Sequence, residues 1–407
     1  MSTALASSLL MALLLAGIRV AARPPPPQVS PSEATVDSIT AIYNFGDSIS
    51  DTGNLLREGD TGILRYTTGF PYGVTIGRHT GRCSDGFLTI DFLAKDLGLP
   101  LLNPYLDRHA DFTHGVNFAV AGATALSTTA LANRGINVSH TNSSLGVQLT
   151  WFKKFMNSTN SPREIRLKLA SSLVMLGEIG GNDYNYVFLQ PRRTNGRYDP
   201  ISNATRSAQS LAHALSLVPE VVQSIADAAK EVLDMGATRM VIPGNFPIGC
   251  MPSYLSAATA SSPASLRDGD GCLVSFNVLA RAHNERLRRA IGELRRSYPK
   301  AKVAYADYLA AYLAILRDAP RLGFDGGAAL RRACCGAGGG EYNFDHNRLC
   351  GAPGTTVCAD PSRRPSWDGI HLTQHGYRVI TELLYRRGLA CPLAVKLPRQ
   401  KPCPPVS

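Results

Sequence analysis

Two short motifs near opposite ends of the chain contain the side-chain types that together activate a serine for attack on a carbonyl. The first, Gly46-Asp47-Ser48, directly follows an apolar run. The second places Asp368 three positions before His371. A serine hydroxyl is a weak nucleophile unless a base removes its proton and a third group orients that base. Ser48, His371 and Asp368 in these roles predict serine-dependent acyl transfer.

The motif around Ser48 is longer than a tripeptide and is followed by three further blocks. It reads Phe-Gly-Asp-Ser-Ile-Ser-Asp-Thr-Gly-Asn over residues 45–54, and the later blocks are residues 115–123, 180–184 and 368–371. In this order the four blocks resemble those of the GDSL esterase/lipase family, in the SGNH hydrolase superfamily, with Ile49 where the family name implies leucine. Residues 80–86 and 334–336 further resemble the plant branch of that family. The similarity extends from about residue 40 to about residue 385.

The resemblance implies a role for each matching residue. Ser48 would be the nucleophile, His371 the base and then the acid, and Asp368 the group that fixes the imidazole tautomer. The oxyanion would be bound by the backbone N–H groups of Ser48 and Gly122 and by the side-chain amide of Asn182. The implied fold is a three-layer α/β/α sandwich with a central parallel sheet, SGNH or flavodoxin-like, and no cofactor or metal is implied. We expect Asp47 to hold the turn at Ser48.

Other chemistries have less support. His371 and His375 are spaced as zinc ligands on a helix, but a metalloprotease would need Glu at Leu372, and no third ligand is evident. The chain has no Gly-x-Ser-x-Gly elbow. Two alternatives to hydrolysis stay open. One is acyl transfer to an alcohol by the same residues, and the other is a catalytically silent carbohydrate-binding protein, against which the intact set of site residues argues.

Short apolar runs bounded by turn residues predict the strands that position these groups. We expect buried strands at residues 41–45, 172–179, 239–243 and 301–306. Helical patterns separate them at residues 204–235, with Pro219 as a kink or break, and at 278–298. This alternation predicts a parallel sheet covered on both faces. Ser48, Asn182 and Asn245 then fall at the carboxyl ends of strands, where catalytic groups gather in such folds.

The N-terminal segment predicts that the protein is exported. Residues 1–22 contain a short apolar stretch followed by small residues, as in a secretory signal peptide, and residues 23–37 form a proline-rich spacer. We expect a single hydrolase domain at 38–392 and a C-terminal tail at 393–407. No later run is a candidate membrane span. The mature protein is therefore expected to be extracellular, in the cell wall.

Sequons and cysteines agree with an oxidising compartment. Asn-x-Ser/Thr sequons begin at four positions, Asn137, Asn142, Asn157 and Asn203. Six of the nine cysteines lie between Cys334 and Cys403, and those at 334–358 occupy a glycine-rich segment without a periodic core face. We expect disulfides there, with the pairing left open, and because the count is odd we expect Cys83 to be unpaired.

Composition limits the partners. Apolar residues make up 44% and charged residues 18% of the 407, which is ordinary for a globular protein. The net charge is +11, but Lys and Arg are scattered, which argues against nucleic-acid binding and fits adsorption to acidic polysaccharide. The sequence shows no long apolar lid helix suited to an oil–water interface, so we expect the implied esterase to hydrolyse short acyl groups, and we expect it to be secreted and monomeric. Its substrate would be a small molecule or polysaccharide, such as acetyl esters of cell-wall polysaccharide or of specialised metabolites.

Overall fold

A computed structural model of the chain describes residues 39–59, 62–158, 160–188, 193–194, 197–198, 204–258, 266–337, 340–392 and 394–403. All of these belong to one compact unit, Thr35–Ser407. The expected signal peptide (1–22), the spacer (23–37) and the sequon asparagine Asn203 lie outside the described residues. The tail expected at 393–407 is described only over 394–403.

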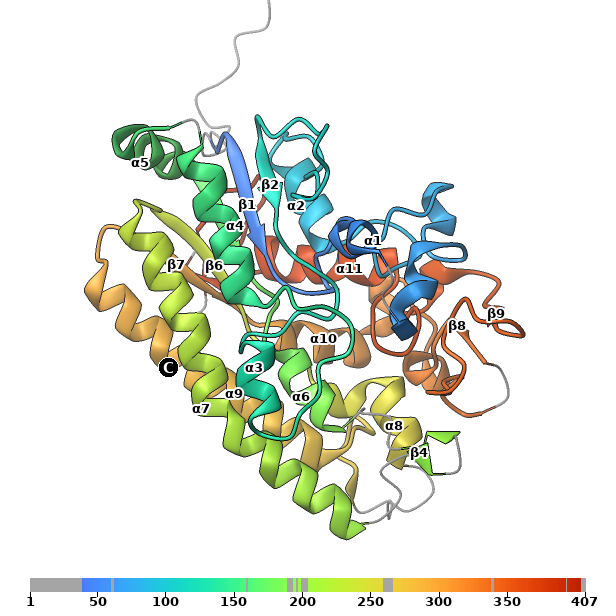
Figure 1. Ribbon diagram of the computed structural model, residues 1–407. Helices are drawn as coiled ribbons and strands as arrows, with labels where there is room; N and C mark the ends of the chain where they lie inside the picture. Colours follow the sequence, from blue (N-terminus) through green and yellow to red (C-terminus); the bar gives the residue numbers. More distant parts are fainter. Residues whose placement is uncertain are drawn as a thin grey trace, which may run out of the picture. The chain divides into compact units, whose positions relative to one another are not determined.

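The centre of this unit is a six-stranded sheet in the order β10-β7-β6-β3-β1-β2 (Figure 1). Strands β2, β1, β3, β6 and β7 run parallel, and the short β10 pairs antiparallel with β7 at one edge. In chain order the five parallel strands read 2-1-3-4-5, the flavodoxin-like order, which reverses direction between β1 and β3. The bounds are β1 Ala41–Phe45, β2 Gly115–Asn117, β3 Ser172–Leu176, β6 Arg239–Pro243, β7 Lys302–Ala306 and β10 Ala390–Cys391.

Burial explains which strands could be predicted. Every residue of β1 and β3 is buried, as expected for strands covered on both faces. The strands predicted at 41–45 and 239–243 are confirmed, and the one predicted at 301–306 begins at Lys302. The run predicted at 172–179 is too long, because β3 ends at Leu176 and residues 177–180 form the loop to the next helix. The short strands β2 and β10 were not predicted.

Helices form a layer on each side of the sheet, which confirms the three-layer α/β/α architecture (Figure 1). In one layer α7 packs between α4 and α9, and in the other α11 packs between α2 and α10. Helices that follow β2, β3 and β6 thus share one layer, as right-handed crossovers require when strands are added in one direction. The bounds are α4 Leu145–Asn157, α7 Ala204–Asp234, α9 Val274–Ser297, α2 Thr89–Asp96, α10 Tyr308–Arg317 and α11 Gln374–Thr381.

The long helix α7 continues through Pro219, where a kink or a break was expected, so the helix does not break there. Helix α9 begins earlier than predicted, at Val274. Pro219 lies on the exposed side of the helix, so its ring is directed away from the core. The buried face of α7, which includes Val218, Val221 and Val222, packs against α9 on both sides of the proline.

The remaining elements are short. The helices are α1 Asn54–Glu58, α3 Thr128–Ala132, α5 Pro162–Ala170, α6 Gly181–Phe188 and α8 Pro252–Ala258. Two small ribbons pair β4 Arg193–Thr194 with β5 Arg197–Tyr198 and β8 Cys335–Gly336 with β9 Thr356–Val357. Short 3₁₀ helices are η1 Gly62–Thr68, η2 Val74–Ile76, η3 Ile248–Cys250, η5 Ala319–Leu322, η6 Gly327–Arg331 and η7 Pro361–Arg363, and η8 Glu382–Arg386 is a π-helical segment.

Four disulfides form, and Cys83 is the unpaired cysteine, as predicted. Two of the bridges, Cys334–Cys358 and Cys335–Cys350, lie in the glycine-rich segment where bridging was expected. The Cys391–Cys403 bridge ties β10 to residues 394–403, part of which packs into the core. The pairs are Cys250–Cys272, Cys334–Cys358, Cys335–Cys350 and Cys391–Cys403.

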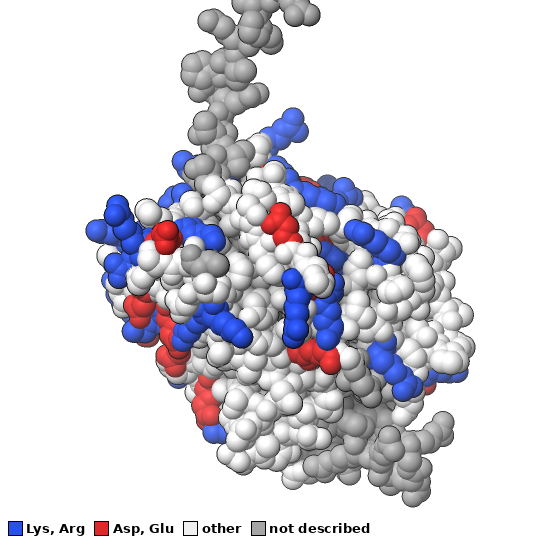
Figure 2. Space-filling view, turned by 45° about the horizontal axis from the view of Figure 1, so that its top comes forward, with Lys and Arg blue, Asp and Glu red and all other residues white. Residues whose placement is uncertain are grey.

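The surface carries the scattered basic residues expected from the sequence. Lys and Arg side chains are spread over the face shown in Figure 2, with acidic side chains among them. Asn137, Asn142 and Asn157 are exposed, and their glycosylation stays a prediction. Across the described ranges, the helices are all too short or too polar to cross a membrane.

Candidate active site

Ser48 lies in the turn that follows β1, at the carboxyl edge of the sheet. The Asp47 carboxylate accepts a hydrogen bond from the Ile49 N–H at 3.0 Å, and the Asp47 N–H donates to the Glu178 carbonyl at 2.9 Å. The Asp47 carbonyl accepts from Ser50 and Asp51 N–H groups. These contacts are those of a residue that holds the turn, and they join the ends of β1 and β3 at the point where the strand order reverses.

Asp368 and His371 lie in a tight turn just before α11. A bridge between Ser366 and Leu372 closes this turn, and the Trp367 N–H donates to the His371 carbonyl at 2.8 Å. The helix itself begins after Thr373, whose hydroxyl caps it. Asp368 is therefore not the helix cap. Its Oδ1 instead accepts from the backbone N–H of His371 at 2.8 Å, which fixes the carboxylate beside the imidazole.

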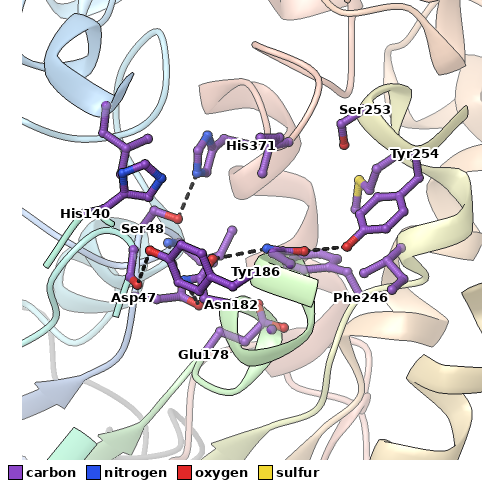
Figure 3. Close-up of a pocket in the computed structure, with 18 of the residues that line it drawn as sticks. Asp47, Ser48, His140, Glu178, Asn182, Tyr186, Phe246, Ser253, Tyr254 and His371 are labelled. Carbon is purple, nitrogen blue, oxygen red and sulfur yellow. Dashed lines mark hydrogen bonds between the residues drawn. The ribbon is translucent and has the colours of Figure 1, made fainter. Parts of the chain in front are cut away.

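The turn brings all three predicted residues into one hydrogen-bonded row. His371 Nε2 is 2.8 Å from Ser48 Oγ (Figure 3), and its Nδ1 is 2.6 Å from Asp368 Oδ2. Tyr72 donates a second hydrogen bond to Asp368 Oδ2 at 2.8 Å. Burial acts to raise the pKa of Asp368, but the charge and hydrogen bonds of His371 and the Ile370 N–H outweigh it and lower the pKa to about 2. Asp368 is thus ionised over the whole physiological range.

Gly122 lies on the loop that follows β2, and this loop is tied to the Ser48 turn. Asp51 Oδ2 accepts hydrogen bonds from the Ala121 N–H at 2.8 Å and the Leu55 N–H at 3.0 Å. The φ of Gly122 is +84°, and an added Cβ would lie 3.0 Å from the His140 Cβ, so glycine is required here. Within the part of the chain that the structure describes, neither the Ser48 nor the Gly122 N–H donates to a protein acceptor.

Asn182 lies at the start of α6, beyond the end of β3. Its Nδ2 donates to the Ala123 carbonyl at 3.0 Å and to Asp47 Oδ2 at 3.3 Å. The amide therefore points at the loop that carries Gly122 and at the turn that carries Ser48. Burial raises the pKa of Asp47 to about 7, against the opposing effect of the Ile49 N–H.

These groups face a cavity of about 150 Å³. Ser48, Gly122, Asn182 and His371 line it together, so the structure brings the predicted site residues to one place (Figure 3). Asn245, predicted at the end of the third strand, lines it as well. Two buried carboxyl groups, Asp47 and Glu178, contribute to the wall, and the described lining residues include no Lys or Arg. The apolar and aromatic wall consists of Ile49, Leu64, Tyr186, Phe246, Ile248, Met251, Tyr254, Leu349 and Ile370.

Several residues that line the cavity could not be identified from the sequence. Glu178 is buried, and its pKa is raised well above the usual range by burial and then by the nearby Asp47 charge. His140, whose ring lies 5.6 Å from that of Tyr186, and Tyr254 were also missed. None of them lies in a motif with recognisable spacing, since each reaches the cavity from a different loop or helix. Only the Glu178 position, next to the block at 180–184, offered a local signal.

The structure does not support the zinc alternative. His371 precedes the cap of α11, so it and His375 do not share a helical face. His375 Nε2 instead lies 2.8 Å from the Leu322 carbonyl oxygen. Over the described ranges, no three His, Cys, Asp or Glu side chains converge in a way that could hold a metal ion.

The flavodoxin-like sheet, covered on both faces, carries Ser48, His371 and Asp368 in one hydrogen-bonded row beside a cavity at its carboxyl edge, which is the arrangement expected from the sequence. The sequence model of the GDSL-like Lipase/Acylhydrolase family matches residues 42–384. The chain belongs to this family and is a carboxylic ester hydrolase, as predicted.

Its relatives are plant enzymes. Acetylajmalan esterase 1 from Rauvolfia serpentina is 42% identical over 349 residues, which cover 85% of this chain and 86% of the relative. A GDSL esterase/lipase from Arabidopsis thaliana is 42% identical over 348 residues, covering 84% and 88%. Among solved structures, a phospholipase A1 from Streptomyces albidoflavus aligns with a TM-score of 0.34 and 14% identity, over 68% of this chain and 82% of that one.

Proposed function

We propose that Ser48 is the nucleophile of this esterase, with His371 as general base and acid and Asp368 as the orienting carboxylate. The observation that carries this proposal is the continuous row from Ser48 Oγ through His371 to Asp368, at 2.8 and 2.6 Å. Ser48 Oγ attacks the ester carbonyl as its proton passes to His371 Nε2. The imidazolium then protonates the leaving alcohol, and water, deprotonated by the same nitrogen, releases the acid from the acyl-serine.

The oxyanion of each tetrahedral intermediate would be bound by three donors. The Ser48 and Gly122 N–H groups have no protein acceptor among the described residues, which leaves them available to a substrate oxygen. The Asn182 amide faces the same turn. Losing one donor of this kind typically costs about 3 to 4 kcal/mol of transition-state stabilisation.

We propose short acyl esters, acetyl esters above all, as substrates. The cavity of about 150 Å³ has room for a group about the size of benzene, which accommodates a short acyl group, and its wall is mainly apolar and aromatic. Two relatives, at 42% and 43% identity, are named acetylajmalan esterases, which supports an acetylated specialised metabolite as the first candidate. Acetylated cell-wall polysaccharide is the second candidate, supported by the net charge of +11.

We also propose export to the extracellular space, with a single hydrolase domain at 38–392. Four disulfides favour an oxidising compartment, and three of the predicted glycosylation sites, Asn137, Asn142 and Asn157, are exposed as an oligosaccharide acceptor must be. N-terminal sequencing and glycosidase treatment of the exported protein would test the cleavage site and the glycans. A protein retained inside the cell with its N-terminus intact would overturn this assignment.

The nucleophile is tested by the initial rate of p-nitrophenyl acetate hydrolysis by the wild type and by Ser48→Ala. We expect the substitution to lower kcat by at least about 10³-fold. Ser216→Ala is a matched control, because Ser216 lies on the outer part of α7 and its hydroxyl bonds only locally, to the His213 carbonyl at 2.7 Å. Equal rates for the wild type and Ser48→Ala would contradict the proposal.

Three further measurements separate the remaining alternatives. Product analysis with an added alcohol acceptor distinguishes acyl transfer from hydrolysis, since a transferase yields the new ester in place of free acetate. Acetylated xylan and acetylajmalan, compared at equal ester concentration, rank the two substrate classes. A wild-type protein that hydrolyses none of these esters but binds immobilised polysaccharide would be a binding protein.

A further inference from the structure

Three side chains on one wall of the cavity form a hydrogen-bonded chain that ends at Asn182. The Tyr254 hydroxyl donates to Asn185 Oδ1 at 2.5 Å, and Asn185 Nδ2 donates to Asn182 Oδ1 at 3.1 Å. Figure 3 shows Tyr254 and Asn182 on the cavity wall, connected by dashed lines through an intervening amide. All three residues line the cavity. The row therefore links α8, which carries Tyr254, to the start of α6.

The donor-to-acceptor direction along this row of hydrogen bonds is fixed at its Asn182 end. The Ala123 carbonyl can only accept, so the Asn182 atom that faces it at 3.0 Å must be Nδ2. Asn182 Oδ1 then faces Asn185, which must donate through its own Nδ2. Asn185 Oδ1 faces Tyr254 in turn, and the tyrosine must donate. Reversal of either amide would place two donors or two acceptors against each other.

Packing around Tyr254 fixes its position at the other end of the row. It is 4% exposed, and its ring packs edge-on against Phe276, at 5.0 Å between centroids, and Phe188, at 5.9 Å. Asn182 and Asn185, by contrast, are only half-buried. The Ala123 carbonyl determines which end of the Asn182 amide donates. The rigid tyrosine hydroxyl holds the half-buried Asn185 amide in the orientation that donates to Asn182 Oδ1.

We propose that Tyr254 is a positioning residue for ester hydrolysis, which acts through Asn185 to keep the Asn182 amide N–H groups turned toward the Ser48 turn. This inference rests on the proposed function, in which Asn182 binds the oxyanion. Because each donor in the row points the same way, each bond polarises the next, and the last amide becomes a better donor to a developing negative charge. The effect is felt in the transition state, where the oxyanion forms, and hardly in substrate binding.

The test uses Tyr254→Phe, which removes only the hydroxyl, and measures kcat and KM for p-nitrophenyl acetate. We expect kcat to fall about tenfold, the loss typical of one buried hydrogen bond, while KM changes less than about twofold. Tyr385→Phe is the matched control. Tyr385 is also buried, but its hydroxyl lies 3.8 Å from Met175 Sδ on the other side of the sheet from α8, so this variant should keep the wild-type kcat. An unchanged kcat in Tyr254→Phe would overturn the proposal.

A double-mutant cycle separates positioning from a structural role. In an Asn182→Ala background the row has nothing left to orient, so adding Tyr254→Phe should cause no further loss of kcat. A tenfold loss that persists in this background would show that Tyr254 acts elsewhere and would overturn the inference. If Asn182→Ala alone leaves kcat unchanged, the oxyanion role of Asn182 is wrong, and the inference falls with it. The first failure leaves Asn182→Ala impaired with a further loss from Tyr254→Phe, whereas the second leaves Asn182→Ala as active as the wild type.

Asn185→Asp provides a second, independent variant. The aspartate can still accept from Tyr254 but cannot donate to Asn182 Oδ1, and its charge repels that oxygen. We expect a larger loss of kcat than in Tyr254→Phe, again abolished in the Asn182→Ala background. Because residue 185 is half-buried and near the surface of the cavity, this variant should fold even if Tyr254→Phe does not. An Asn185→Asp enzyme with wild-type kcat would contradict the proposal.

Discussion

The Asp368 carboxylate accepts four hydrogen bonds. Its Oδ1 accepts from the backbone N–H groups of Ile370 at 2.9 Å and His371 at 2.8 Å, while its Oδ2 accepts from the His371 ring and from Tyr72. Two of these donors belong to its own turn and hold its position. The Tyr72 hydroxyl is different, because it shares Oδ2 with the imidazole and so competes for the same negative charge.

At the residue scale, we therefore predict an altered pH profile for Tyr72→Phe. Loss of the hydroxyl leaves more charge on Asp368 Oδ2 to stabilise the imidazolium form of His371. The acid limb of the kcat/KM profile should therefore move to higher pH. The check is a set of kcat/KM values for p-nitrophenyl acetate between pH 4.5 and 8.5.

A merely structural role for Tyr72 would give a different result. Packing loss would lower the activity at every pH by the same factor and leave the midpoint of the acid limb in place. A Tyr72→Phe profile parallel to that of the wild type would thus contradict the electrostatic argument. Tyr385→Phe again controls for the loss of a buried tyrosine hydroxyl outside the site.

Residues with chemistry of their own could be found in the sequence, whereas their supporting residues could not. Ser48 lies in a ten-residue block, and Asp368 and His371 share one turn, so local spacing was enough to single them out. Tyr72 contacts Asp368 across 296 positions of the chain, and Tyr254 reaches Asn185 across 69. No local pattern encodes such contacts, because they depend on how the strands and helices pack.

At the scale of elements, the turn that carries Asp368 and His371 is held from outside by two disulfide-bonded cysteines. The Cys334 N–H donates to the Ser366 carbonyl at 3.0 Å, and the Cys335 N–H donates to the Trp367 carbonyl at 2.6 Å. Cys335 and Cys350 also pack with Trp367 and Tyr72 in one buried cluster. The Cys335–Cys350 bridge therefore supports both the turn and the tyrosine that bonds Asp368.

We predict that breaking this bridge affects activity more than stability alone explains. Cys335→Ser/Cys350→Ser opens a link between residues 15 apart, and Cys391→Ser/Cys403→Ser opens one between residues 12 apart. Loop closure predicts a similar loss of about 3 kcal/mol of unfolding free energy for both. Only the first pair should lower kcat, by about tenfold or more, in assays well below either unfolding temperature. Equal activity in the two variants would contradict the supporting role of the bridge.

The elements themselves were predictable in proportion to their length and burial. The fully buried β1 and the mostly buried β6 read as short apolar runs, and their bounds follow directly from the sequence. β2 has three residues and β10 two, too few for any pattern to be recognised. The sequence also suggested a kink or a break at Pro219, because a proline lacks the N–H that an intrahelical hydrogen bond needs. The structure shows that the helix does not break and that Pro219 lies on its exposed side.

At the scale of the whole molecule, buried ionisable groups of two kinds couple stability to pH. Burial raises the pKa of Asp47 and of Asp183 to about 7 and raises that of Glu178 well above its usual range. Each binds its proton more tightly when folded, so its contribution to stability is full below about pH 4 and is lost as pH rises through the folded pKa. Burial lowers the pKa of His283 to about 3 and of His346 to about 4. These two histidines bind a proton more tightly in the unfolded chain, so they destabilise the folded protein at low pH. This destabilisation disappears as the pH rises to about 6.5.

The last prediction isolates one of these groups, Asp183, which accepts hydrogen bonds from the Ala125 and Leu126 N–H groups at 2.8 and 3.0 Å. We expect the unfolding free energy of the wild type minus that of Asp183→Asn to fall by about 1 kcal/mol per pH unit between pH 5 and 7. Above about pH 7.5, where Asp183 is ionised in both states, the difference should level off. Urea unfolding at half-unit steps of pH measures it, and Asp111→Asn, at an exposed carboxylate whose pKa is lowered by hydrogen bonds with Thr113, should give a constant difference over the same range. A constant difference for Asp183→Asn as well would mean that its carboxyl group is already ionised in the folded protein, and the loop before α3 would then be held by a charged acceptor at every pH.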